Sequence, residues 1–269
     1  IENGLEIHYD GDLPGRSGLG SSSAFTVGLL NALYAFKSQM VSKHRLATES
    51  IHIEQDLIKE TVGSQDQTNA AYGGFNRIRF GVDGQIIVDP ITVDDERIHT
   101  LDNNLMLFYT GIIRTAEKVA KSYVKDIQAK GKQLVRIHAM VDEAIEIMMN
   151  GDLDDFGLLL NEAWQEKRSL SKLVSNRQVD EIYTAALSAG ALGGKLSGAG
   201  GGGFLLLYVP VERQPNVKRK LSHLLHVPFV FESNGSEIIF HDRHQEYSEE
   251  ELTHSERSHT PFMELKDLK

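Results

Sequence analysis

The segment PGRSGLGSSSA, residues 14–24, holds three glycines and four serines directly before an apolar pattern with helical spacing over residues 24–36. Glycines let a backbone turn sharply and approach a ligand closely, and the amides and hydroxyls at a helix start can bind phosphate oxygens. The segment therefore predicts a phosphate-binding loop that leads into a helix. A tight turn closed by an ordinary serine cap is the alternative. The loop lacks the Lys-Ser/Thr ending of GxxxxGK[ST], which excludes the P-loop class.

A second glycine run, KLSGAGGGGFLLLYV, covers residues 195–209 and contains G-x-G-x-x-G at Gly198, Gly200 and Gly203. A dinucleotide fingerprint follows a strand and opens a helix, whereas this run leads into an apolar strand pattern, so its context excludes a Rossmann site. Nearly pure glycine costs chain entropy, which indicates a close backbone approach to a ligand. A purely structural hairpin is the alternative.

The remaining patterns alternate between strand and helix. Strands are predicted over residues 5–9, 76–80, 85–88, 105–109, 204–209, 229–231 and 237–241. Helices are predicted over residues 24–36, 45–61, 134–148, 156–173, 179–189 and 211–225. Helices collected to one side of the strands indicate an α+β fold with two lobes. We predict an N-terminal lobe over residues 1–112, a C-terminal lobe over residues 113–243 and a polar tail over residues 244–269.

Composition narrows the class of protein. With 269 residues and 41% hydrophobic content the chain can bury a sizeable core, and its net charge of −10 argues against a nucleic-acid partner. No apolar run approaches the roughly 20 residues needed to cross a bilayer, and the first residues lack the pattern of a signal peptide. The absence of cysteine excludes disulfides and fits a reducing compartment. We predict a cytoplasmic protein without a membrane partner; the sequence leaves a homodimer open.

Taken together, the two glycine runs resemble the second and third signature motifs of the GHMP kinases, a family named for galactokinase, homoserine kinase, mevalonate kinase and phosphomevalonate kinase. In that family the pattern P-x-x-x-G-L-G-S-S-A is the ATP phosphate loop, and the later run lies beside substrate and phosphates. The resemblance covers most of residues 1–242 and implies that ATP and substrate bind in a cleft between two lobes. The first family motif would precede Ile1.

Three strings narrow the resemblance further. GSQDQTNAAYGG at residues 63–74, YTGIIRTA at residues 109–116 and KLSGAGGGG at residues 195–203 resemble heptose kinases that act on D-glycero-D-manno-heptose 7-phosphate. The resemblance implies an ATP-dependent kinase that phosphorylates the anomeric hydroxyl, giving a 1,7-bisphosphate for nucleotide-activated heptose. A fucokinase-like or other sugar 1-kinase stays open, as does a non-catalytic ligand-binding protein with the same fold.

The resemblance also implies roles for individual residues, with ATP and Mg²⁺ as cofactors and a sugar phosphate as the small-molecule partner. Asp66 is the expected catalytic residue, which takes the proton from the sugar hydroxyl or orients it. Ser22 and Glu54 are the expected magnesium ligands. The expected ATP-binding residues are Pro14, Gly18, Leu19, Gly20, Ser21, Ser22 and Ser23. The expected substrate-binding residues are Gln65, Thr110, Gly111, Arg114, Lys195, Gly198, Ala199, Gly200 and Gly201.

Several of these residues have a plainer interpretation. Glu54 could be a solvated carboxylate on a polar helix, Asp66 could cap a helix that begins at Gln67, and Lys195 and Arg114 could be surface cations. The histidines show no HExxH or comparable ligand spacing, so we predict no zinc site. The serine clusters lack a G-x-S-x-G elbow, so hydrolase chemistry is not indicated.

Overall fold

The computed structural model describes residues 5–13, 15, 17–112, 116–124 and 127–242. The chain divides into two compact units, residues 1–237 and residues 238–269. The helices and strands of the described residues all belong to the first unit. The predicted lobe boundary at residues 112 and 113 stays a prediction, and the predicted tail lies outside the described residues. Within the described ranges, no helix is long and apolar enough to cross a membrane.

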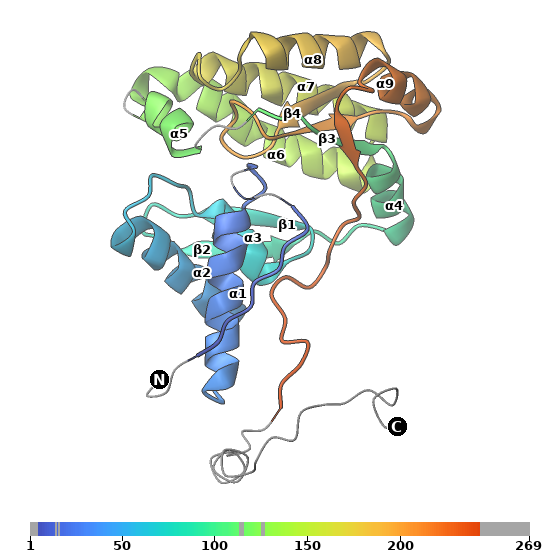
Figure 1. The fold of residues 1–269 in the computed structure, drawn as a ribbon. Helices are drawn as coiled ribbons and strands as arrows, with labels where there is room; N and C mark the ends of the chain where they lie inside the picture. Colours follow the sequence, from blue (N-terminus) through green and yellow to red (C-terminus); the bar gives the residue numbers. More distant parts are fainter. Residues whose placement is uncertain (1–4, 14, 16, 113–115, 125–126, 243–269) are drawn as a thin grey trace, which may run out of the picture. The chain divides into compact units, whose positions relative to one another are not determined.

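The first part of the chain folds as helices around a two-stranded hairpin (Figure 1). The elements are α1 (Ser21–Phe36), α2 (Lys43–His52), the π-helical turn η1 (Ile53–Leu57), α3 (Gln65–Tyr72), β1 (Asn76–Phe80) and β2 (Ile86–Pro90). The hairpin strands pair antiparallel, and Gly84 supplies the left-handed φ of 82° in their turn. Apolar side chains of α1, α2 and α3 form one small buried cluster of Val27, Leu46, Ala47 and Ala71.

The rest of the first unit is built around a four-stranded antiparallel sheet with the order β4-β5-β3-β6. Its strands are β3 (Leu105–Tyr109), β4 (Gly193–Leu196), β5 (Phe204–Tyr208) and β6 (Leu225–Val227). Its helices are α4 (Asp95–Asn103), α5 (Ala116–Val124), η2 (Ile127–Lys130), α6 (Gly131–Asn150), α7 (Leu153–Leu170), α8 (Arg177–Ser188), η3 (Val211–Arg213) and α9 (Gln214–Lys220). This mixture of helices and sheets agrees with the predicted α+β class.

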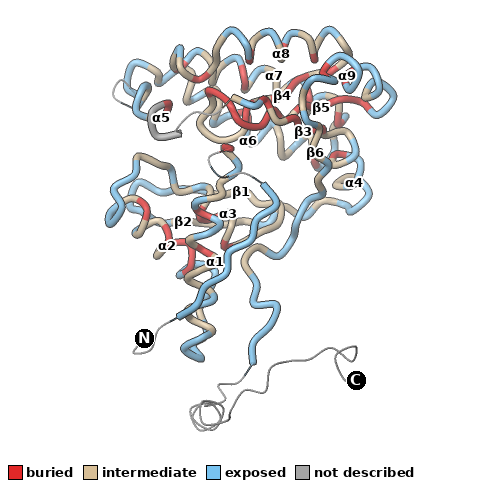
Figure 2. The backbone as a smooth tube through the Cα atoms, viewed as in Figure 1, coloured by how far each residue is buried: buried red, intermediate tan, exposed pale blue. Residues whose placement is uncertain are grey.

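The main core lies between this sheet and α7 and α8. Figure 2 shows buried backbone concentrated along β3, β4 and β5. Trp164 of α7 is fully buried and its ring lies 6.2 Å from that of Tyr183 on α8. Because β4 and β5 are anchored in this core, the glycine run that joins them is held at a fixed place. The second glycine run is thus the connection of a β-hairpin. A hairpin connection can also line a binding site.

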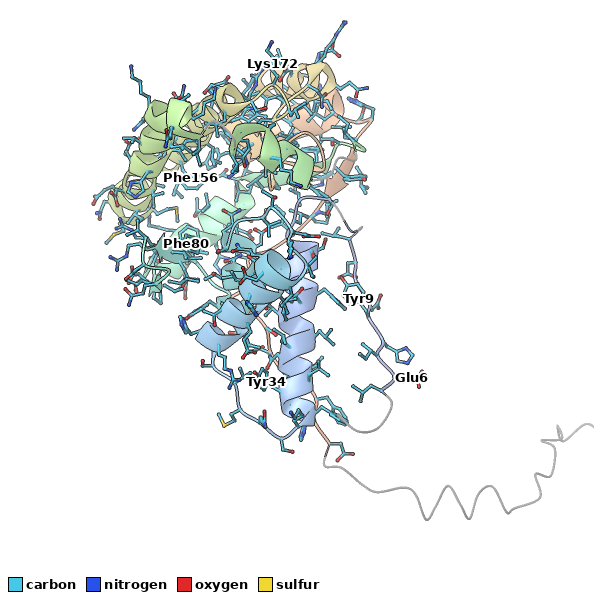
Figure 3. All side chains as sticks on the ribbon, turned by 90° about the vertical axis from the view of Figure 1, so that its left-hand side faces the viewer. Glu6, Tyr9, Tyr34, Phe80, Phe156 and Lys172 are labelled. Carbon is cyan, nitrogen blue, oxygen red and sulfur yellow. The ribbon has the colours of Figure 1, made fainter. Side chains whose placement is uncertain are left out.

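Several predicted elements differ from the structure. Residues 5–9 are extended but form no ladder, and Tyr9 instead packs its ring edge-on against Phe25 of α1 at 5.0 Å (Figure 3). The predicted helix over residues 45–61 changes at Ile53 into η1, where the Ile58 amide donates to the carbonyl of Ile53, five residues earlier. The predicted helix over residues 211–225 is shorter, because α9 ends at Lys220.

The predicted strands at residues 229–231 and 237–241 are wrong; the strand in this region is β6 at residues 225–227. The segment that follows β6 attaches to the first part of the chain by isolated contacts instead of a ladder. The Gly74 amide donates to the Glu232 carbonyl, and the Lys43 ammonium donates to the Asn234 carbonyl at 2.8 Å. Asn31 of α1 donates to Ser236 at 3.0 Å. One backbone amide and two side-chain donors therefore take the place of the strand partner that the apolar pattern predicted.

Candidate active site

The first glycine loop enters α1 through two glycines in the left-handed region. Gly18 has a φ of 83° and Gly20 has a φ of 69°, a left-handed region that favours glycine. Gly20 is the N-cap of α1, and its carbonyl accepts from the Ala24 amide at 2.9 Å. The amides of the first helical turn have no partner within the helix, and Ser21, Ser22 and Leu19 remain at least partly exposed. These amides could bind an anion at the helix start. Pro14 lies outside the described residues.

Asp66 lies directly against this loop. A Cβ built at Gly20 would come within 3.3 Å of the Asp66 Cγ and 3.4 Å of its Oδ2. Asp66 is the second residue of α3, which begins at Gln65 after Ser64, so Asp66 does not cap the helix. Gln65 is exposed and donates to the Asp66 Oδ1 at 3.4 Å. The structure thus brings the expected catalytic carboxylate into contact with the expected phosphate loop.

Glu54 is a buried carboxylate, with 1% of its surface exposed, and this rules out the solvated alternative. Ser23 donates to its Oε2 at 3.0 Å, Thr26 donates to its Oε1 at 3.2 Å, and Gln67 donates to its Oε2 at 2.5 Å. The serine that donates to Glu54 is therefore Ser23, which is buried, whereas Ser22 is exposed. Three donors therefore satisfy both oxygens of this carboxylate inside the protein.

The oxygen donors around Glu54 fit the chemistry of magnesium, which prefers carboxylate and hydroxyl oxygens and keeps several waters. Within the described ranges, no group of three or more His, Cys, Asp or Glu side chains could hold a metal by itself. A magnesium ion here would therefore need phosphate oxygens as further ligands. The assignment of Ser22 and Glu54 as magnesium ligands stays a prediction.

The two glycine runs meet backbone to backbone. A Cβ at Gly18 would lie 3.0 Å from the Ser197 carbonyl oxygen, and a Cβ at Gly198 would lie 2.8 Å from the Gly18 carbonyl oxygen. Gly203 approaches the Ser17 carbonyl more closely still. Glycine at these positions therefore permits a contact between segments about 180 residues apart that a side chain would block.

The second glycine run is tied to the end of β3. The Thr110 hydroxyl and amide both donate to the Gly203 carbonyl, at 2.7 and 2.9 Å. The Gly203 amide returns a bond to the Ile112 carbonyl at 2.8 Å, and Gly111 has a φ of 70°. Thr110 and Gly111 are thus neighbours of the glycine run, as the sequence predicted. Arg114 lies outside the described residues.

The middle of the same run is held against the loop that follows α7. The Gly201 amide donates to the Val174 carbonyl at 2.7 Å, and a Cβ at Gly200 would lie 2.6 Å from that oxygen. Ala199 packs against the main core. Gly198, Ala199, Gly200 and Gly201 are therefore brought together beside the phosphate loop.

Two lysines face this region. Lys195 of β4 lines a cavity of about 490 Å³ whose walls are mainly apolar side chains of α6 and α7, while β1 contributes the polar residues Asn76 and Arg77. Burial lowers the pKa of Lys195, and Asp66 opposes this shift. Lys167 of α7 donates to the Gly198 carbonyl, and its pKa is lowered to about 7 by burial and by Lys195, again opposed by Asp66. Lys195 is therefore not an ordinary surface cation.

Lys167 is the residue that the sequence analysis missed. The usable signal was its position on α7, three residues from both Trp164 and Leu170, which are buried. A lysine on the buried face of an amphipathic helix needs a partner. The spacing of Lys167 from Trp164 and Leu170 therefore made it a candidate site residue.

Sequence comparisons agree with this geometry. Residues 1–74 match the family described as GHMP kinases N terminal domain, and residues 136–226 match the family described as GHMP kinases C terminal. The chain belongs to the GHMP kinase family. Solved structures of this family share its fold, which confirms the predicted α+β class.

Named relatives of this GHMP kinase include heptose kinases. The chain is 31% identical over 220 residues to D-glycero-alpha-D-manno-heptose 7-phosphate kinase of Campylobacter jejuni, covering 81% of this chain and 65% of that protein. A crystal structure of a D-glycero-D-manno-heptose 1-phosphate kinase from Bacteroides thetaiotaomicron has a TM-score of 0.67 at 26% identity, covering 83% of this chain and 64% of that chain. A bifunctional fucokinase/GDP-fucose pyrophosphorylase of Arabidopsis thaliana is 28% identical over 225 residues, covering 81% of this chain and 21% of that protein. The chain thus spans less than two thirds of the length of each of these relatives.

Proposed function

We propose that this GHMP kinase transfers the terminal phosphate of ATP to the anomeric hydroxyl of D-glycero-D-manno-heptose 7-phosphate, giving the 1,7-bisphosphate. The contact between Asp66 and the first glycine loop at Gly20 carries the proposal. It places a carboxylate that can accept a proton beside a loop that can bind phosphate. The similarity to named heptose kinases supports the choice of sugar. The product would serve the synthesis of a nucleotide-activated heptose.

Phosphoryl transfer needs the attacking and leaving oxygens held in line and the developing charge neutralised. The loop of residues 18–23 would hold the ATP phosphates with the amides at the start of α1. Magnesium, when bound, would neutralise phosphate charge, and Ser22 and Glu54 are its proposed ligands. The bond from Ser23 keeps the Glu54 carboxylate in place. Asp66 would accept the proton of the sugar hydroxyl or orient that hydroxyl.

The sugar phosphate would lie beside the second glycine run. Lys195 and Arg114 are proposed to bind its phosphate, since a lysine supplies a point charge and an arginine supplies paired donors. Gln65, Thr110 and Gly111 would complete the pocket with the backbone of residues 198–201. A cytoplasmic location and a homodimer remain predictions.

A fucokinase-like sugar 1-kinase is the second candidate, favoured by the similarity to the Arabidopsis fucokinase. The two candidates share the ATP machinery and differ in the acceptor alone. A panel of D-glycero-D-manno-heptose 7-phosphate, L-fucose and D-galactose, with products identified by ³¹P NMR, separates them.

The role of Asp66 is tested by ADP release with MgATP and D-glycero-D-manno-heptose 7-phosphate. Loss of a general base typically lowers turnover by about 10²–10⁴-fold, so we expect Asp66→Asn to fall in this range with an unchanged melting temperature. Asp155→Asn, an exposed aspartate in the first turn of α7, is the matched control and should keep full turnover. Equal turnover of Asp66→Asn and the unmodified chain would refute the assigned role.

A further inference from the structure

Lys167 presents hydrogen-bond donors to the site. Its ammonium donates to the carbonyl oxygen of Gly198, the glycine whose backbone touches Gly18 of the phosphate loop. An ammonium group carries three donors, so two remain for another acceptor. Lys167 is thus placed where the two glycine runs meet, although neither motif contains it.

Lys167 and Lys195 are like charges held near one carboxylate. Burial is the main cause that lowers the pKa of both lysines, repulsion from Lys195 lowers that of Lys167 further, and Asp66 raises both. Two lysines opposite one aspartate leave an excess of positive charge when all three are ionised. A dianion such as a phosphate monoester would remove the repulsion and balance this charge.

Two charged neighbours of Lys167 on α7 have partners on other helices. Glu162 accepts from Arg136 of α6 at 2.6 Å, and Arg168 pairs with Asp180 of α8 at 2.9 Å. Among the residues that the structure describes, Lys195 of β4 and Asp66 of α3 are the charged groups that shift the pKa of Lys167. The charge state of Lys167 therefore depends on what occupies the site.

We propose that Lys167 and Lys195 bind one phosphate group between them. Because a nearby anion favours the ammonium form, Lys167 gains a proton when this anion binds. The inference deepens the proposed function and rests on it. The anion comes either from ATP or from the sugar phosphate, which share the same phosphate chemistry. Lys167 can donate to Gly198 in both charge states, so the glycine run keeps its place while the charge changes.

Calorimetry at pH 8 tests the proposal without turnover. At this pH an amine with a pKa of about 7 is mostly neutral, whereas a phosphate monoester, with a second pKa of about 6, is fully charged. Because a nearby anion favours the ammonium form, binding should take up most of one proton. Repeating the titration in several buffers that differ in ionisation enthalpy measures the number of protons taken up on binding. The experiment has two arms, MgATP alone and D-glycero-D-manno-heptose 7-phosphate alone. The ligand whose binding takes up a proton is the source of the phosphate.

Three variants separate binding from a structural role. Lys167→Met should lose the proton uptake and at least about tenfold in affinity, the size expected when a charged hydrogen bond of about 1.5–3 kcal/mol is removed. Lys167→Arg, whose side chain is always charged, should lose the uptake but keep affinity within a few-fold. Lys172→Met removes an exposed lysine just beyond α7, labelled in Figure 3, and should keep both.

The outcomes distinguish this inference from the proposed function. Binding and turnover with no proton uptake, or with uptake that persists in Lys167→Met, would overturn the lysine pair and leave the kinase assignment intact. Failure of both ligands to bind the unmodified chain would overturn the two together. If Lys167→Met does not fold, Lys167→Arg still decides, because retained uptake in that variant contradicts the proposal.

Discussion

Gly198→Ala tests whether the two glycine runs touch as the structure has them. The added Cβ would lie 2.8 Å from the Gly18 carbonyl oxygen and 3.0 Å from its Cα, and both atoms are backbone. Backbone cannot rotate away as a side chain can, so one of the two loops must move. Gly198 also has a φ of 64°, a conformation that costs an alanine about 1–2 kcal/mol.

A matched control separates the energetic effect of the contact from that of the backbone strain. Gly84, in the turn between β1 and β2, has a φ of 82°, and nothing lies within 4 Å of its built Cβ. Gly84→Ala should therefore show the strain alone, about 1–2 kcal/mol. Gly198→Ala should cost a further amount of about 1–3 kcal/mol, the usual penalty for overpacking. Both substitutions lower the entropy of the unfolded chain alike, so that effect cancels in the comparison.

Urea unfolding, followed by the fluorescence of Trp164, measures both free energies of unfolding. We expect Gly198→Ala to unfold at a clearly lower urea concentration than Gly84→Ala, with similar slopes. A difference below about 0.5 kcal/mol is within the range of ordinary surface substitutions, and it would mean that residues 18 and 198 are not in contact in the folded protein.

Two further predictions concern buried charges. Glu54→Ala removes the acceptor of Gln67 and of two hydroxyls, so urea unfolding should show a loss of at least about 1–3 kcal/mol, and an unchanged midpoint would contradict the buried network. For Lys167, the folded pKa of about 7 lies below its usual value of 10.5, so the unfolded chain binds more protons between these two values. The free energy of unfolding of the unmodified chain should therefore rise relative to Lys167→Met from pH 7 to pH 10, measured without ligand, and a constant difference would refute the shift.

The sequence was a good guide where a local pattern determines the structure. The strand predicted over residues 76–80 is confirmed as β1, and its partner was predicted within two residues, because an Asp-Gly turn fixes the hairpin between alternating residues. The first glycine loop was also placed correctly before a helix, although α1 begins at Ser21 instead of Ala24. The serines that could bind a ligand belong to the helix itself. The helix boundary is set by the φ angle of a glycine, and the spacing of apolar residues does not reveal such a boundary.

Non-local contacts explain most of what the sequence did not predict. Residues 229–231 and 237–241 have a strand-like composition, but they form no ladder with any strand that the structure describes. The segment 45–61 has a continuous helical pattern, yet at Ile53 it becomes a π-helical turn. This turn contains Glu54, whose carboxylate accepts hydrogen bonds from α1 and α3. Pairing partners and buried acceptors come from distant segments, and side-chain periodicity along one segment carries no information about them.

The site joins two separately packed clusters, and this explains why its residues are scattered along the sequence. The phosphate loop opens α1, which packs with α2 and α3, while the second glycine run belongs to the β4–β5 hairpin of the main core. Their contact at Gly18 and Gly198 consists of backbone atoms, which provide little apolar burial. Asp66 of α3 and the lysines Lys167 and Lys195 attract each other across this contact, and a phosphate bound as proposed would add to that attraction. Ligand binding should consequently stabilise this contact more than it stabilises either cluster.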